Sequence, residues 1–186
     1  LAVGLGIPLG LALGRYPVLS ALCDPLMMAL YATPQMALIP LYVIWFGVGV
    51  ASKIFVVFIS ALFPVWLNTA TGIRQIDRVL VVAARSFGAS EGQLFFKVYL
   101  PNALPAILTG VRLAWGRGVL GMVIGEMYVS VAGLGHLIMA TGQAVQTADL
   151  FFLIFLAGLL GYLPAYGLRR LEQRWVRWHQ GGDAHD

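Results

Sequence analysis

The side chains that usually perform enzyme chemistry are few in this sequence and lie far apart. Neither Lys53 nor Lys97 follows a glycine, so the sequence lacks the G-x4-G-K-[ST] loop that binds nucleotide phosphates. His136, His179 and His185 have no carboxylate or cysteine at metal-ligand spacing, and no nucleophile is paired with a base. The pattern favours a protein that is not an enzyme, and it predicts neither a metal site nor a cofactor.

Ionisable residues that interrupt apolar stretches are more informative: Asp24, Arg112, Arg117 and Glu126. A charged side chain at the centre of a membrane helix costs about 2.5–3.5 kcal/mol on insertion scales, so each should face protein, water or the membrane interface. Arg117 could pair with a carboxylate or lie low in a long helix that projects into the cytoplasm, and we expect the second. Glu126 should lie near the outer half of a pore, as a gate or a structural contact.

Composition indicates a membrane protein. Of the 186 residues, 60% are hydrophobic and 11% are charged, and the mean hydropathy is +0.84. A soluble domain would have roughly 25% charged residues. Uncharged runs over residues 25–52, 54–73 and 150–168 reach or approach the roughly 20 residues that cross a ~30 Å hydrocarbon core as a helix.

These runs predict one domain over residues 1–186, with an all-α fold: a polytopic transmembrane helical bundle with a cytoplasmic hairpin. Residues 1–14, which have no initiator methionine or basic leader, are interpreted as half of a truncated helix, and the bundle is expected to lack its first helix. The cytoplasmic loop is predicted at residues 79–101 and a cytoplasmic tail at 169–186. The other predicted helices cover residues 25–48, 54–72, 102–126 and 149–168.

The basic residues predict the orientation of the bundle. With Arg15 inside, the helix order places Lys53 outside and the stretch from Arg74 to Arg117 inside. Lys53 is then the only one of the 12 lysines and arginines outside, as expected because basic residues favour cytoplasmic loops. This topology explains the net charge of +4 without nucleic acid. It also requires that the glycine-rich segment 127–148 does not cross, and we expect it to be an outer or re-entrant element that lines the pathway.

Glycines recur at a spacing of four residues in two of the expected helices. Gly6, Gly10 and Gly14 share one helical face, and Gly121 and Gly125 repeat the spacing. Small residues let helix backbones approach closely in a membrane. We expect packing within the chain here, ahead of a seam between two copies.

The predicted cytoplasmic hairpin has a clear local pattern. Residues 79–84 are apolar and compatible with a helix, Gly88 permits a turn, and Ser90 to Gln93 matches a capping box. Two short helices joined at Gly88 follow from this pattern. The hairpin could insert its small residues into a groove of a partner protein, or it could rest on the lipid headgroups.

The spacing A-A-x3-G-x9-[IV]-x-L-P, from Ala83 to Pro101, resembles the "EAA" loop of ABC-importer permeases. Further similar strings include Ile39-Pro40-Leu41, Gly110-Val111-Arg112-Leu113 and Ala132-Gly133-Leu134-Gly135, so that the resemblance extends over most of the chain. It is greatest with the nitrate, sulfonate, taurine and bicarbonate branch of these permeases. The residues to which the resemblance assigns coupling to an ATPase are Ala83, Ala84, Arg85, Ser86, Phe87, Gly88, Ala89, Ser90, Leu100 and Pro101.

The resemblance implies a multi-pass permease subunit of an ATP-driven importer in the bacterial plasma (inner) membrane. It implies a separate cytoplasmic ABC ATPase, an extracytoplasmic solute-binding protein and a second permease copy in a homodimer. The expected solute is a small anion such as a sulfonate, taurine or nitrate, with a vitamin precursor as an alternative. One position departs from the family pattern: the usual glutamate before Ala-Ala is Val82, which removes a charge from the docking loop.

Polar and aromatic residues near the expected outer half of the bundle are candidates for the solute pathway. An anionic solute would need hydrogen-bond donors and a weak positive potential, because conduction requires release. The candidates are Thr33, Gln35, Trp45, Trp115, Met122, Glu126 and Tyr128. Two other classes of protein stay open: a self-contained ion-driven transporter or channel, and a membrane scaffold that transports nothing. For an ion-driven transporter or channel we would expect paired intramembrane carboxylates or inverted repeats in the sequence.

Overall fold

The computed structural model describes residues 1–175, and these form helices without any strand. Residues 176–186 of the predicted tail, with His179 and His185, lie outside the described residues. The helices are α1 (Ala2–Arg15), α2 (Pro17–Ala32), the 3-10 turn η1 (Gln35–Leu38), α3 (Ile39–Phe46), α4 (Val50–Arg74), α5 (Arg78–Ser86), α6 (Glu91–Leu94), the π-helical η2 (Phe95–Tyr99), α7 (Leu100–Val129), α8 (Leu134–Gln143) and α9 (Thr147–Trp175).

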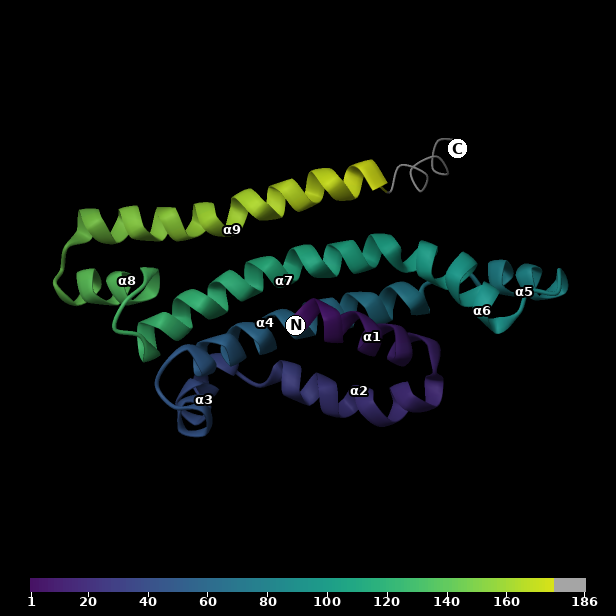
Figure 1. Ribbon diagram of the computed structural model, residues 1–186, viewed down its shortest axis with the longest axis horizontal. Coiled ribbons are helices and arrows are strands. Elements are labelled where there is room, and N and C mark those ends of the chain that lie inside the picture. The colour runs from purple at the N-terminus through teal and green to yellow at the C-terminus, as the bar shows by residue number, and fades with distance from the viewer. Residues whose placement is uncertain (176–186) are drawn as a thin grey trace.

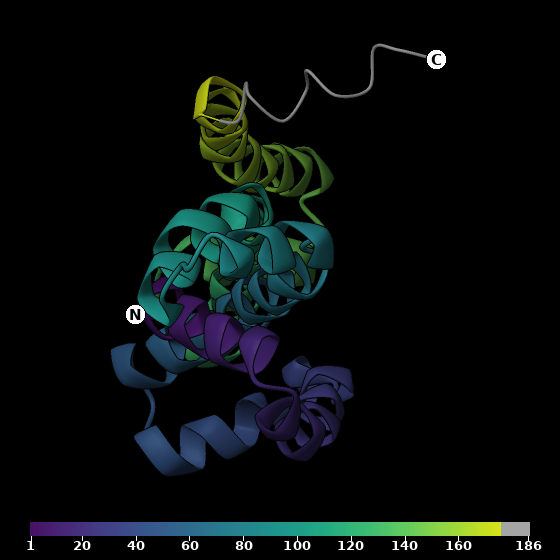
Figure 2. The same ribbon diagram turned by 90° about the vertical axis from the view of Figure 1, so that its right-hand side faces the viewer.

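Helices α4, α7 and α9 are long and apolar enough to cross a membrane, and the bent pair of α2 with η1 and α3 is a further candidate span. Figure 1 shows α4, α7 and α9 side by side along the long axis, and Figure 2 shows the order of the layers, from α9 through α7 to α4 and α1, with α2 and α3 beyond. The predicted all-α helical bundle is confirmed.

Helix α4 is the centre of the packing because α1 covers one of its faces and α7 covers another. The glycines of α1 make the first contact possible. A Cβ atom on Gly10 would lie 2.5 Å from the Cβ of Thr69 and 2.7 Å from the carbonyl oxygen of Trp66. Gly6 faces Val65 and Gly14 faces Ile73 in the same way, so all three glycines pack within the chain, as predicted.

Helix α7 reaches α4 through glycines as well. A Cβ on Gly110 would lie 3.0 Å from the carbonyl oxygen of Pro64, and one on Gly121 would lie 2.8 Å from the Oγ of Ser60. Side chains that the two helices bury between them include Val65 and Ala114. Together α1, α4 and α7 form the tightly packed part of the bundle, whereas the apolar window of α9 has no buried residue.

The prediction of one helix over residues 25–48 is wrong. Helix α2 begins earlier, at Pro17, and ends at Ala32, after which the chain turns by 82° into η1 and α3. Thr33 has an extended backbone with ψ 133°, which is the conformation that a following proline favours because its ring clashes with a helical neighbour. Pro34 therefore breaks the helix instead of only bending it.

The two ends of the molecule differ in their contents. Helices α5 and α6 lie at one end, here called the inner end, and α9 runs toward it. Helices α3 and α8 lie at the other, the outer end (Figure 1). Arg74 lies at the inner end of α4, and Lys53 lies near its outer end, where it donates a hydrogen bond to Ser130 at 3.2 Å. This arrangement agrees with the orientation predicted from the basic residues.

Candidate functional site: the inner hairpin and the cavity at the helix break

The inner hairpin, residues 77–99, is held by caps at both of its short helices. The carboxylate of Asp77 accepts a hydrogen bond from the backbone N–H of Val79 at 2.8 Å and so caps α5. Ser90 and Gln93 form the predicted capping box of α6. Between the helices, Gly88 has a φ of +78°, which a residue with a side chain rarely adopts.

The hairpin is also fixed to the membrane helices. Helix α6 leads without a break through η2 into α7, so the hairpin and the long helix form one continuous element. Glu91 at the start of α6 pairs with Arg15 at the end of α1 and, at 2.7 Å, with Arg85 of α5. The hairpin is therefore joined to α7 by continuous helix and to α1 by an ion pair.

The two faces of α5 have opposite surroundings. Val81 and Ala84 pack against the cluster of buried residues that contains Ile73 and Leu94. The opposite face is exposed and mainly apolar: Val79 is 69% exposed, Val82 63% and Phe87 92%, with Ala83 and Ser86 between them. Because these positions are separated by three or four residues, they lie side by side on one helical face.

The residues that the sequence assigned to ATPase coupling therefore fall into three sets. Those that are exposed at the inner end are Ala83, Arg85, Ser86, Phe87, Gly88 and Ser90. Ala84 and Ala89 are half-buried and pack beneath the hairpin. Leu100 and Pro101 form the first turn of α7 and are half-buried, so they position the hairpin and do not belong to its exposed face.

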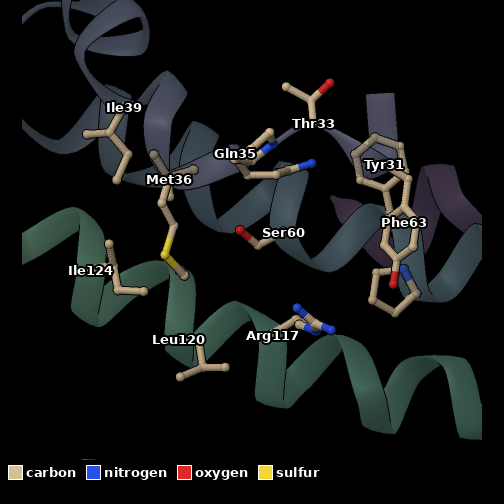
Figure 3. A pocket seen from close by; sticks show the side chains of 14 residues that line it. Tyr31, Thr33, Gln35, Met36, Ile39, Ser60, Phe63, Arg117, Leu120 and Ile124 are labelled. Atoms are coloured by element: carbon tan, nitrogen blue, oxygen red, sulfur yellow. The ribbon is translucent and has the colours of Figure 1, made fainter. Parts of the chain in front are cut away.

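A cavity of about 470 Å³ lies at the break between α2 and η1, where the chain also faces α4 and α7. Figure 3 shows Gln35 and Met36 on one side of this space, Ser60 on α4, and Arg117, Leu120 and Ile124 on α7. Irregular backbone at membrane depth is tolerated where it is buried in protein or lines a water-filled space. The break at Thr33 and Pro34 meets this condition because both residues line the cavity.

The polar groups of the cavity have different partners. The hydroxyl of Thr33 donates to the carbonyl oxygen of Ala29 at 2.9 Å, and its side chain points away from Arg117 (Figure 3). The Oε1 atom of Gln35 is buried and has no hydrogen-bond partner among the described residues. Ser60 and Arg117 line the same cavity from α4 and α7 (Figure 3).

Arg117 lies near the middle of α7, 12 positions from Val129 at the outer end, which is about 18 Å along the helix. If the outer membrane surface lies at Val129, Arg117 is close to the middle of a ~30 Å hydrocarbon core. The expectation that it lies low in the cytoplasmic part of the helix stays a prediction. The four salt bridges among the described residues do not include it.

The other charged residues within the helices each have a partner. Arg112 pairs with Glu172 of α9 at 2.8 Å, and the same carboxylate accepts a hydrogen bond from Thr109. Asp24 pairs with Arg74 at 2.7 Å. Both pairs join neighbouring helices in the inner half of the bundle, so they contribute to the fold.

Glu126 binds the first turn of α8. Its Oε2 accepts a hydrogen bond from the backbone N–H of Gly135 at 2.9 Å. A Cβ on Gly135 would lie 2.0 Å from the carbonyl oxygen of Val123, so glycine is needed for this close approach. Of the two roles considered for Glu126, this geometry favours a structural contact. Helix α8 has 10 residues, too few to cross, and none of them lines the cavity.

The structure does not bring the remaining pathway candidates together. Thr33 and Gln35 line the cavity, whereas Trp115 and Met122 line a second, apolar cavity of about 280 Å³ beside α7 and α9. Trp45 is 61% exposed and Tyr128 67% exposed, on the outer parts of α3 and α7. Sequence reasoning left out Tyr31, Ser60 and Arg117 as lining residues; a charge in an apolar run was a signal for the third. Among residues 1–175, no group of histidine, cysteine and carboxylate side chains is suited to a metal ion.

Comparison with known proteins gives a consistent result. The family described as "Binding-protein-dependent transport system inner membrane component" matches residues 4–178. The taurine transport system permease protein of Escherichia coli is 36% identical over 178 residues, 96% of this chain and 65% of that protein. A second Escherichia coli protein, provisionally named aliphatic sulfonates transport permease protein, is 42% identical over 158 residues, 85% of this chain and 60% of that protein.

A third relative has a different kind of solute in its name. The formylaminopyrimidine transport permease protein of Halalkalibacterium halodurans is 31% identical over 180 residues, 97% of this chain and 72% of that protein. The chain thus spans 60–65% of the length of the two Escherichia coli relatives.

Proposed function

Since the chain belongs to the family of binding-protein-dependent transport system inner membrane components, we propose that it is the permease part of an importer in which a separate subunit hydrolyses ATP. In this role the chain is a transport subunit of the membrane and not an enzyme. Its solute is small and enters from a binding protein at the outer end. Two copies would enclose the pathway.

The observation that best supports this function is the exposed apolar face of α5. Val79, Val82 and Phe87 face away from the bundle at the inner end, where the basic residues predict cytoplasm. Exposed apolar patches of this kind mark interaction sites. The cap at Asp77 and the ion pairs of Glu91 hold the face in place, so a docked ATPase would move α6 and α7 with it.

Docking by this face would depend on shape and apolar contact. The usual glutamate of the loop is Val82 here, and its side chain is 63% exposed in the middle of the face. A buried ion pair is a weak source of affinity, because desolvation of the charges offsets their attraction. An apolar side chain at this position is therefore compatible with docking to an ATPase whose groove is itself apolar.

The test is whether the permease co-purifies with its ATPase and stimulates ATP hydrolysis in liposomes that contain the binding protein. Ala83→Arg places a long charged side chain in the exposed face without disturbing the core, so the complex should be lost. Val131→Arg is the matched control, because Val131 is 91% exposed at the outer end. It should retain the ATPase.

Each outcome has a clear meaning. Loss of the ATPase in Ala83→Arg, with normal membrane insertion and a normal control, supports coupling through the hairpin. Equal recovery of the ATPase with both variants would remove the main support for the proposal. Solute uptake without any ATPase, driven by an ion gradient, would favour the self-contained transporter instead.

A further inference from the structure

We propose that the cavity at the helix break is an anion site on the solute pathway, in which Arg117 binds the acid group of a sulfonate-type solute. The inference rests on the proposed transport function and adds the chemical class of the solute. The names of the relatives do not decide this class, since they include both sulfonates and an aminopyrimidine. The charge in the cavity does.

The first argument is the energetic state of Arg117. Arg117 is exposed in the single chain, and with the outer membrane surface at Val129 it would lie about 18 Å deep, where contact with lipid is costly. It forms no salt bridge with the described residues, although Arg112 on the same helix pairs with Glu172. Arg117 instead lines a cavity of about 470 Å³, which is ample for a solute of a few heavy atoms.

The second argument is independent of charge and concerns Gln35. Its Oε1 atom is buried without a hydrogen-bond partner among the described residues, which costs about 1–3 kcal/mol unless something binds there. Gln35 lies directly after the break between α2 and η1, and broken helices at membrane depth are typical of solute sites in transporters. The orphan oxygen calls for a hydrogen-bond donor, such as an amino group on the solute, whereas the amide nitrogen of the same side chain can donate to an oxyanion.

A sulfonate fits this set of groups better than an uncharged solute does. The planar guanidinium of Arg117 can donate two parallel hydrogen bonds to two oxygens of one acid group. The carboxamide of Gln35 and the hydroxyl of Ser60 line the same cavity and can supply further donors (Figure 3). Most of the other lining is apolar, including Phe63 and Leu120, so an alkyl chain on the acid would also be accommodated.

The site can be tested without transport, which separates this inference from the proposed function. The permease alone, in nanodiscs of phosphatidylcholine, is titrated with trifluoromethanesulfonate and with uncharged 2,2,2-trifluoroethanol, and binding is measured by fluorine NMR. We expect the anion to bind in preference to the alcohol. Arg117→Gln should weaken anion binding about tenfold or more, as expected for loss of a charge-assisted hydrogen bond.

Two further variants make the result specific. Arg117→Lys keeps the charge but loses the planar fork, so its affinity should lie between those of wild type and Arg117→Gln. Arg112→Gln removes a cation of the same helix outside the cavity and should leave the affinity unchanged. Sulfonate uptake and ATP hydrolysis by the complete transporter, measured in parallel, report on the proposed function alone.

Two results would overturn the anion site. The first is equal binding of the anion and the alcohol to the wild type, or no binding of either. The second is unchanged anion affinity in Arg117→Gln. If the permease dimer is lost as well in that case, Arg117 pairs with the second copy. A working transporter combined with either of these results would leave the proposed function intact.

Discussion

Within the described part of the chain, charged residues are paired in the inner half of the bundle, whereas the arginine in the cavity at the helix break is not. All four salt bridges of the described residues lie in the inner half, where they join α1 to α6, α2 to α4, α5 to α6 and α7 to α9. The cavity contains Arg117, which takes part in none of them. Both regions are built on α7, and the two arginines of that helix are about one and a half turns apart.

This difference separates two uses of charge in one chain. Arg112 is bound within the protein, so its charge stabilises the contact between α7 and α9. Arg117 faces a space that a solute could enter, so its charge is available to a ligand. Substitutions in each region can test this difference.

The largest effect is expected from breaking a pair in the inner half. Arg112→Gln leaves the carboxylate of Glu172, whose side chain is 17% exposed, without its cation. Loss of a hydrogen bond between charged groups that are partly buried lowers the free energy of unfolding by about 1.5–3 kcal/mol. Thermal unfolding in detergent measures this change. A variant as stable as the wild type would show that the pair contributes nothing to the fold.

Two glycines of the hairpin have open space around them but differ in backbone conformation. A Cβ on Gly88 or on Gly92 would meet no atom within 4 Å, but only Gly88 has a positive φ. Gly88→Ala should destabilise the hairpin by about 1–2 kcal/mol, whereas Gly92→Ala should stabilise it by about 0.5–1 kcal/mol.

Hydrogen exchange over residues 78–94 measures both changes locally. Faster exchange in Gly88→Ala and slower exchange in Gly92→Ala would agree with a hairpin whose shape depends on one backbone conformation. Equal exchange in the two variants would contradict that account. Solute-stimulated ATP hydrolysis should decrease in Gly88→Ala and should not decrease in Gly92→Ala.

A third prediction removes the difference between the regions by giving Arg117 a partner. Leu120 lines the cavity one turn after Arg117 and is 54% exposed. Leu120→Glu places a carboxylate beside the guanidinium and should lower the affinity for trifluoromethanesulfonate about tenfold, similar to Arg117→Gln. Leu120→Gln, of equal size but uncharged, is the control. An equal loss in both would point to shape and not to charge.

Much of the fold could be predicted because hydropathy, caps and glycine spacing are patterns within short stretches of sequence, which can be recognised without knowing contacts between distant residues. The apolar helices, the capping box at Ser90 and the packing of Gly6, Gly10 and Gly14 all follow from such patterns, and the orientation stays a prediction. The break at Thr33 did not, since an uncharged run looks continuous whether or not its helix is broken. The extended conformation favoured before Pro34 was the available signal.

The cavity was harder to predict because it depends on contacts between distant residues. The pair of Arg112 and Glu172 joins positions 60 residues apart, and without it nothing in the sequence distinguishes Arg112 from Arg117. Trp115 and Met122 were sound candidates by type, but they lie on the side of α7 that faces the second cavity. The close contacts of Gly110 and Gly121 with α4 are part of the packing that decides which side of α7 faces each cavity.

The smallest effect is expected at Gln35. Gln35→Leu replaces a buried carbonyl oxygen that has no partner with an apolar group of similar size, so the free energy of unfolding should stay equal or rise by less than about 1 kcal/mol. The affinity for trifluoromethanesulfonate should nevertheless fall about two- to fivefold, because one hydrogen-bond donor is lost. Thermal unfolding and fluorine NMR on the same sample separate the two effects. A loss of more than about 2 kcal/mol would mean that the carboxamide serves the fold, as Arg112 does, and the cavity would then resemble the inner half of the bundle.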